Sequence, residues 1–120
     1  MAEEPRLGIT ELDGVSIASF HGASILDTET IQRIARELYE VAESPAHRKV
    51  VFDFHDVRFI SSQTLGVLLT LRRKADKANV KVALACIRPE LSRVFEITNL
   101  DKLFDFFDST EDAVANLNES

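Results

Sequence analysis

The stretch 50–69 constrains the fold of this chain more than any other. It begins with a nearly continuous run of apolar, β-branched and aromatic side chains and then changes to apolar residues at helical spacing, VVFDFHDVRFISSQTLGVLL. The first part predicts a buried strand and the second part predicts a helix. A strand that is apolar on both faces is typical of a sheet covered by helices on both sides, so we expect 50–54 to be the central strand.

Ser61 and Ser62 stand where the strand pattern changes to the helix pattern. The simpler interpretation is that one of them is the N-cap, whose oxygen accepts a hydrogen bond from the first turn and contributes about 1 kcal/mol relative to alanine. The other interpretation is phosphorylation, because the positive end of a helix dipole and its free N–H groups accommodate a phosphate dianion. The two interpretations are compatible, since an N-cap hydroxyl is also an exposed one.

The segments before this stretch predict a hairpin and a helix. Asp13-Gly14 lies between 7–12 and 15–20, and this dipeptide suits a two-residue turn that pairs its flanking strands antiparallel. After residue 22 the pattern predicts an amphipathic helix that begins with Asp27 or Thr28 as its cap and ends near Ser44-Pro45. Its apolar face consists of Ile31, Ile34, Ala35, Leu38, Val41 and Ala42.

The segments after it alternate between helix and strand. A second helix is predicted over 62–77, a strand over 81–87, a short helix from Pro89 to about Asn99, an edge strand over 103–107 and a final helix capped near Ser109. Leu65, Leu68, Leu69 and Arg72 are predicted to lie on one stripe of the second helix, and Cys86 is predicted to be a small core residue.

This order of elements predicts an α/β fold. Strands separated by helices require crossover connections, so we expect a mixed sheet of four to five strands with about four helices packed on it. With 120 residues and 45% hydrophobic content, the chain is expected to be a single domain, 1–120, with its core over about 7–117.

Composition excludes several classes of partner and site. A formal charge of −6 disfavours nucleic acid or an anionic membrane as partner, and the cations Arg72, Arg73, Lys74 and Lys77 are predicted to form a solvated helix end. A lone cysteine excludes an internal disulfide and a cysteine-rich zinc site. The chain shows neither a signal peptide nor an apolar run long enough to cross a bilayer, so we expect it in the cytoplasm.

No catalytic constellation emerges from the sequence. His21, His47 and His55 are scattered, and none of the common metal-binding, phosphate-binding or nucleophile motifs is present. Asp53 and Asp56 bracket His55, but Asp56 is expected at the exit of the strand. The sequence therefore leaves undecided whether the three side chains form a common site. We therefore expect no enzyme activity, no cofactor and no metal site.

Two segments carry a resemblance to a known family. FISSQTLGVLL at 59–69 and RPELSRVFEITNLDKLF at 88–104, together with the order of elements, resemble the STAS domain of bacterial anti-sigma factor antagonists over about residues 7–117. In that family the strand-to-helix turn reads Asp-Ser-Ser/Thr-Gly-Leu-Gly, and an anti-sigma factor that is also a serine kinase phosphorylates its first serine. Aligned on Leu65-Gly66, the resemblance implies Ser62 as phosphoacceptor, with Ser61 and Thr64 as secondary candidates.

The chain departs from the family motif at several positions. Ser61 stands in place of the aspartate, Gln63 in place of the second hydroxyl residue and Thr64 in place of the first glycine. Ala23 and Ser24 replace the acidic residues that usually follow the glycine equivalent to Gly22. The resemblance implies that a partner binds at the helix start, through Ser61, Ser62, Gln63, Thr64 and Gly66.

Two functional hypotheses follow. In the first, the domain binds an anti-sigma factor serine kinase and is released by phosphorylation of Ser62, with a serine phosphatase as a secondary candidate partner. In the second, the domain is an unswitched STAS scaffold or a sensor of a small ligand or nucleotide, and the two serines serve only as caps.

Overall fold

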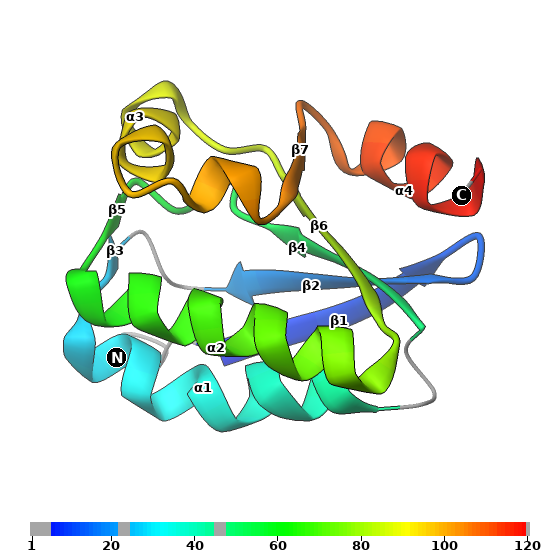
Figure 1. Ribbon diagram of the computed structural model, residues 1–120, viewed down its shortest axis with the longest axis horizontal. Helices are drawn as coiled ribbons and strands as arrows, with labels where there is room; N and C mark the ends of the chain where they lie inside the picture. Colours follow the sequence, from blue (N-terminus) through cyan, green and yellow to red (C-terminus); the bar gives the residue numbers. More distant parts are fainter. Residues whose placement is uncertain (1–5, 22–24, 45–47, 120) are drawn as a thin grey trace.

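A five-stranded mixed sheet forms the centre of the molecule (Figure 1). The computed structural model describes residues 6–21, 25–44 and 48–119. The strand order is β1-β2-β4-β6-β7, with β1 antiparallel to β2 and every other pair of neighbours parallel. The strands are β1 (Arg6–Leu12), β2 (Val15–His21), β4 (Lys49–Asp53), β6 (Lys81–Ala85) and β7 (Asp105–Phe107).

The predicted hairpin and central strand are both confirmed. Asp13 and Gly14 have φ angles of 51° and 81°, as a two-residue turn with positive φ at both positions requires. Strand β4 lies between β2 and β6, and its Val50, Val51 and Phe52 are completely buried. The central position explains the apolar run in the sequence, because both faces of this strand pack against other side chains.

Helices cover both faces of the sheet. Helices α1 (Thr28–Glu43) and α2 (Ser62–Ala78) run side by side in the same direction (Figure 1). Together with α3 (Pro89–Ile97) and the short 3-10 helix η1 (Leu100–Lys102), they enclose the larger core. Helix α4 (Thr110–Glu119) packs on the opposite face, over residues that include the small Ala83 and Ala85.

A second sheet of two short strands was not predicted. Strands β3 (Ile25–Leu26) and β5 (Phe59–Ile60) pair in parallel just before the starts of α1 and α2. Two-residue strands are too short to show periodicity. The pairing is therefore visible only in the folded chain.

The structure refines one prediction about side-chain placement and contradicts another. Of the stripe Leu65, Leu68, Leu69 and Arg72, only Leu68 is buried and the other three are partly buried. The remaining buried residues of α2 are Thr64, Val67, Leu71 and Ala75. Strand β6 ends at Ala85, since Cys86 has a left-handed φ of 62°, and Cys86 is partly exposed rather than a core residue.

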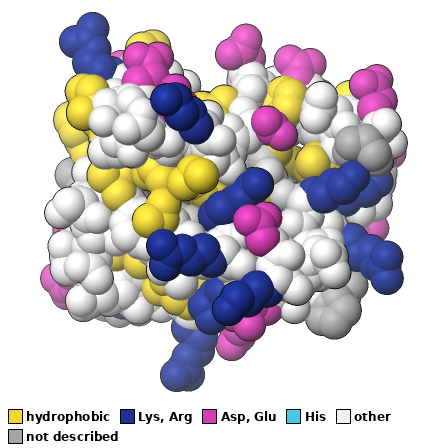
Figure 2. Space-filling model, viewed as in Figure 1, with side chains coloured by type: hydrophobic (Ala, Val, Ile, Leu, Met, Phe, Trp, Pro, Cys, Tyr) yellow, Lys and Arg dark blue, Asp and Glu magenta, His cyan; other side chains and the backbone are white. Residues whose placement is uncertain are grey.

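The surface over α2, α3 and η1 combines hydrophobic and basic side chains. Figure 2 shows a band of hydrophobic side chains on this side, with Lys and Arg side chains beside it. Within the described ranges, none of the helices combines the length and the apolar character needed to cross a bilayer.

Candidate functional site

The N-cap of α2 is Ser61. Its backbone is extended, with φ −88° and ψ 167°, and its side-chain oxygen accepts a hydrogen bond from the backbone N–H of Thr64 at 3.2 Å. The sequence left open which serine is the cap. Ser62 is instead the first residue of the helix itself, so its hydroxyl is not needed for capping.

Thr64 is completely buried and connects α2 to β3. Its hydroxyl donates a hydrogen bond of 2.7 Å to the carbonyl oxygen of Leu26 and lies 3.2 Å from the hydroxyl oxygen of Ser61. The backbone N–H of Ser61 donates to the same carbonyl at 2.9 Å. These bonds satisfy the buried polar groups and fix the direction in which α2 leaves β5.

Ser62 lies on the outer side of the same turn. Its side chain and that of Gln63 are exposed, and the Ser62 hydroxyl makes no hydrogen bond with any residue that the structure describes. The first turn of α2 contains no acidic residue. The positive end of the helix dipole is therefore not neutralised locally, and an anionic group on Ser62 would be favoured there.

An open groove runs between the first turns of α2 and the middle of α1. It has a volume of about 400 Å³ and is lined by Tyr39, Ser62, Gln63, Gly66, Val67 and Thr70. Beyond the groove, Lys74 of α2 forms an ion pair of 3.0 Å with Glu43 of α1. Its ammonium nitrogen also lies 5.2 Å from the centre of the Tyr39 ring. The groove thus lies between two helices that this ion pair connects.

Gly66 is exposed in the groove and is not required by internal packing. A Cβ atom added there would meet no other atom within 4 Å. Glycine within a helix costs about 1 kcal/mol relative to alanine. Since nothing inside the fold explains this cost, the open space above Gly66 is available to another molecule.

The structure therefore divides the five predicted partner-binding residues. Ser62, Gln63 and Gly66 lie together on the groove, whereas Thr64 is buried and Ser61 is half-buried in its capping bond. Tyr39 and Thr70 also line the groove, and no sequence motif singled them out. Tyr39 belongs to α1 and precedes Ser62 by 23 residues, so only the packing of α1 on α2 reveals that it lines the groove. Ala23 and Ser24 lie outside the described residues.

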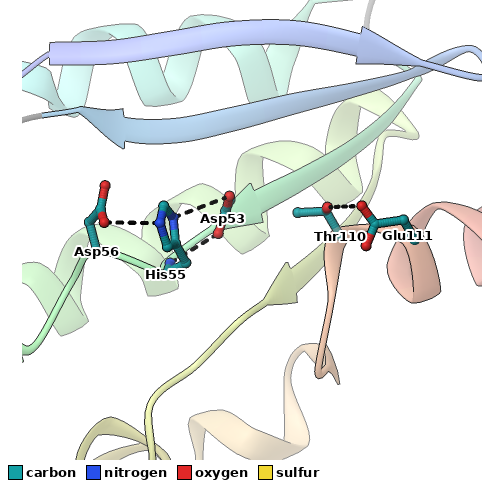
Figure 3. A network of polar contacts seen from close by, with 5 residues as sticks. All are labelled: Asp53, His55, Asp56, Thr110 and Glu111. Carbon is teal, nitrogen blue, oxygen red and sulfur yellow. Dashed lines mark hydrogen bonds and ion pairs between the residues drawn. The ribbon is translucent and has the colours of Figure 1, made fainter.

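A separate polar cluster follows β4 (Figure 3). The His55 ring lies between two carboxylates, with Nε2 3.0 Å from Asp56 and Nδ1 3.8 Å from Asp53. Asp53 also accepts a hydrogen bond of 2.9 Å from the backbone N–H of His55, which fixes the turn at the end of the strand. The three side chains that the sequence left unassigned thus do meet. Across the described segments, no group of three histidine, cysteine or acidic side chains could hold a metal ion.

Cys86 lies near this cluster, and its thiol is less acidic than that of an ordinary cysteine. Partial burial and the nearby carboxylate of Asp53 raise its pKa to about 11. It is therefore protonated near neutral pH, unlike the thiolate of a reactive cysteine. His21 is the last residue of β2, and His47 lies outside the described residues.

A family model named STAS domain matches residues 7–113. The chain belongs to the STAS domain family. The match includes the start of α2, its groove and the whole sheet except Arg6. This confirms the resemblance and the mixed α/β fold predicted from the sequence.

Individual STAS relatives agree with this assignment. A STAS-domain containing protein of Pseudomonas aeruginosa is 37% identical over 70 residues, which are 58% of this chain and 67% of that protein. BtrV of Bordetella bronchiseptica, which is named as an anti-sigma factor antagonist, is 26% identical over 110 residues and 92% of each chain.

Solved structures show the same fold. An anti-sigma-factor antagonist (STAS) domain protein from Planctomyces limnophilus has a TM-score of 0.84 at 19% identity, over 92% of this chain and 96% of that chain. The Bacillus cell fate determinant SpoIIAA in its phosphorylated form has a TM-score of 0.69 at 15% identity, over 92% of this chain and 98% of that chain. The murine anion transporter Slc26a9 contains the fold in 19% of its chain, with a TM-score of 0.71 at 16% identity over 92% of this chain. The fold alone therefore does not specify one function.

Proposed function

We propose that this STAS domain is a non-enzymatic anti-sigma factor antagonist that binds an anti-sigma factor serine kinase through the start of α2. Phosphorylation of Ser62 then ends the interaction. The observation that carries this proposal is the difference among three hydroxyls: Ser62 is exposed on an open groove, whereas Ser61 caps the helix and Thr64 is buried. A kinase must reach its acceptor, and of these three Ser62 is the most accessible.

The first turn of α2 suits a residue that changes charge. In the reaction, the Ser62 oxygen bonds to the γ-phosphorus of ATP, ADP leaves, and the hydroxyl proton passes to a base of the kinase. The product carries about −1.5 to −2 charge at neutral pH. The backbone N–H groups and dipole of α2 stabilise this charge, so the domain stays folded when modified.

The same charge opposes binding. A partner seated in the groove would desolvate the phosphate without necessarily offering it a cation. A tenfold loss of affinity corresponds to only about 1.4 kcal/mol, which a dianion within an interface readily supplies. Phosphorylation would thus change partner binding much more than domain stability.

The departures from the family motif are compatible with this role. Ser61 caps α2 as the usual aspartate could, because both residue types are strong N-caps. Thr64 replaces a glycine, and its side chain is accommodated in the interior with its hydroxyl bonded to Leu26. Further support comes from SpoIIAA, a protein of the same fold with a phosphorylated form. A serine phosphatase would complete the cycle, and we place it with the kinase in the cytoplasm.

The test combines modification and binding. The chain is incubated with ATP and a kinase-type anti-sigma factor encoded in the same genome, and peptide mass spectrometry locates the phosphate. We expect it on Ser62. The kinase is also titrated with Ser62→Asp, which should bind at least several-fold more weakly because an unpaired buried carboxylate costs about 1–3 kcal/mol.

A matched control separates the site from the charge. Thr110→Asp places a carboxylate at the first residue of α4, which packs on the opposite face of the sheet, and should leave binding unchanged. A phosphate on Ser61 or Thr64 would refute the assignment of Ser62. If Ser62→Asp binds as tightly as the native chain, the alternative of an unswitched scaffold or small-ligand sensor is favoured.

A further inference from the structure

Large hydrophobic side chains are exposed on two parts of the described surface. Ile9 and Leu12 lie on the edge strand β1, whereas Phe59, Ile97 and Leu103 lie on β5, α3 and the residue after η1. Phe59 is 61% exposed and Ile97 is 74% exposed. Isolated exposed hydrophobic residues are common, but a contiguous patch usually marks an interaction site.

The elements that carry the second group are neighbours, since α3 contacts both β5 and η1. Figure 2 shows hydrophobic side chains that extend from the region of β5 and α3 to the space between η1 and α2. Two partly buried leucines of α2 lie on the side of the helix that faces η1, in line with Arg72, whose guanidinium lies 6.0 Å over the Phe104 ring. We call this surface the apolar band; it consists of Phe59, Leu65, Leu69, Ile97 and Leu103.

Cations border the apolar band on the side of α2. This helix carries Arg72, Arg73, Lys74 and Lys77 against the single carboxylate of Asp76, although the chain as a whole has a charge of −6, and Lys74 is paired with Glu43 of α1 at 3.0 Å. Arg72 is paired with Asp76 at 3.2 Å, whereas Arg73 is exposed and makes no ion pair with the described residues. Lys102 on η1 is exposed as well, beside Asp101.

The band is continuous with the start of α2. Phe59 lies two residues before the N-cap Ser61, and Leu65 lies next to Gly66. Ser62 lines the groove and lies three and seven residues before Leu65 and Leu69 of the apolar band, so the groove and the band are neighbouring strips on the surface of the same helix. A partner that covers the end of α2 can therefore contact both surfaces.

We infer that the apolar band is the affinity anchor for the anti-sigma partner, occupied by an apolar segment of that partner flanked by acidic side chains. This inference rests on the proposed function and deepens it. Binding energy in protein interfaces is concentrated in a few buried apolar or aromatic anchors, while charged groups near the edge set the association rate and its salt dependence. The anchor then supplies affinity, and Ser62 supplies the switch.

The experiment titrates each kinase-type anti-sigma factor of the same genome with the native chain and two variants. The double variant Phe59→Ser/Ile97→Ser removes two exposed anchors, and Ile9→Ser is the matched control at an exposed apolar residue on β1. We expect the double variant to bind at least about tenfold more weakly, and the control to bind like the native chain. Thermal melting checks that both remain folded.

A charge variant tests the acidic flanks of the partner. Arg73→Glu/Lys102→Glu should lower affinity by several-fold and flatten its dependence on salt, whereas Arg36→Glu on the exposed side of α1 should do neither. Unchanged salt dependence would refute an acid-flanked segment.

The outcomes separate this inference from the proposed function. If Ser62→Asp weakens binding and the double variant does not, the anchor is refuted and the switch remains. If the double variant weakens binding and Ser62→Asp does not, the anchor is supported and the switch is refuted. If no kinase-type anti-sigma factor binds the native chain, both fail. If the native chain dimerises in sedimentation and the double variant abolishes this, the band is a self-association surface and the anchor is refuted.

Discussion

The first turn of α2 has an inner side and an outer side that differ in chemistry although their residues are similar. On the inner side, the hydroxyls of Ser61 and Thr64 are bonded to the backbone and to each other. On the outer side, Ser62 is exposed and makes no such bond with the described residues, and Gly66 has open space above it. The inner residues maintain the fold, and the outer residues are available to a partner.

The identity of a hydroxyl residue therefore does not define its role. Ser61 and Ser62 are adjacent and chemically identical, yet a turn of one residue around the helix start places them in different environments. Substitutions on the two sides should therefore separate effects on stability from effects on binding.

Thr64→Val should have the largest effect on stability among these positions. Valine preserves the shape but removes the hydroxyl that donates to Leu26, so the free energy of unfolding should fall by about 1–2 kcal/mol. Urea denaturation measures the change. Partner affinity should stay within about twofold of native at a temperature where the variant is folded. Native stability in this variant would show that the buried hydrogen bond contributes nothing.

Ser61→Ala should have the next largest effect on stability, lowering the free energy of unfolding by about 1 kcal/mol because the N-cap is lost. The same denaturation experiment applies, and the double variant with Thr64→Val should lose less than the sum of the two, because the hydroxyls lie 3.2 Å apart. Strict additivity would mean that they act independently.

Gly66→Ala should move stability in the opposite direction. The methyl group meets nothing within 4 Å and alanine favours helix, so we expect a gain of about 0.5–1 kcal/mol. Binding of the anti-sigma partner should weaken at the same time, because the methyl group occupies the floor of the groove. Gain of stability with full binding would show that the partner does not approach this residue.

Ser62→Ala should change stability least, by less than about 0.5 kcal/mol, because its hydroxyl is not the cap. It should bind the partner like the native chain and become insensitive to the kinase. Comparison with Ser61→Ala, the same change one residue earlier, provides the control. A loss near 1 kcal/mol would indicate that both serines contribute to capping.

Much of the fold follows from local patterns in the sequence. The apolar run 50–54, the turn Asp13-Gly14 and the cap Asp27 each lie where propensity and packing agree, and the structure confirms all three. The burial of Thr64 in α2 did not follow from the pattern, because polar residues are mostly exposed. Its partner, the Leu26 carbonyl, is 38 residues away in the sequence, so local reasoning could not find the bond.

The candidate site was predictable in part for the same reason. The change from strand to helix located the serine pair, but the choice of Ser61 as cap depends on a backbone angle that the sequence does not reveal. The groove depends on Tyr39, which belongs to a different helix. The left-handed Cys86 is a further example, since a non-glycine residue in this conformation carries no sequence signal here.

The pairing of β3 with β5 has a consequence for the cooperativity of the molecule. The carbonyl oxygen of Leu26 accepts hydrogen bonds from the Ser61 N–H and the Thr64 hydroxyl. The next residue, Asp27, caps α1 by accepting a hydrogen bond of 2.8 Å from the Thr30 N–H. The beginnings of α1 and α2 therefore share one short piece of backbone. Local opening at this point would release both helix starts together, so the two first turns form one unit of hydrogen exchange, and a partner that protects one of them slows solvent exchange in the other.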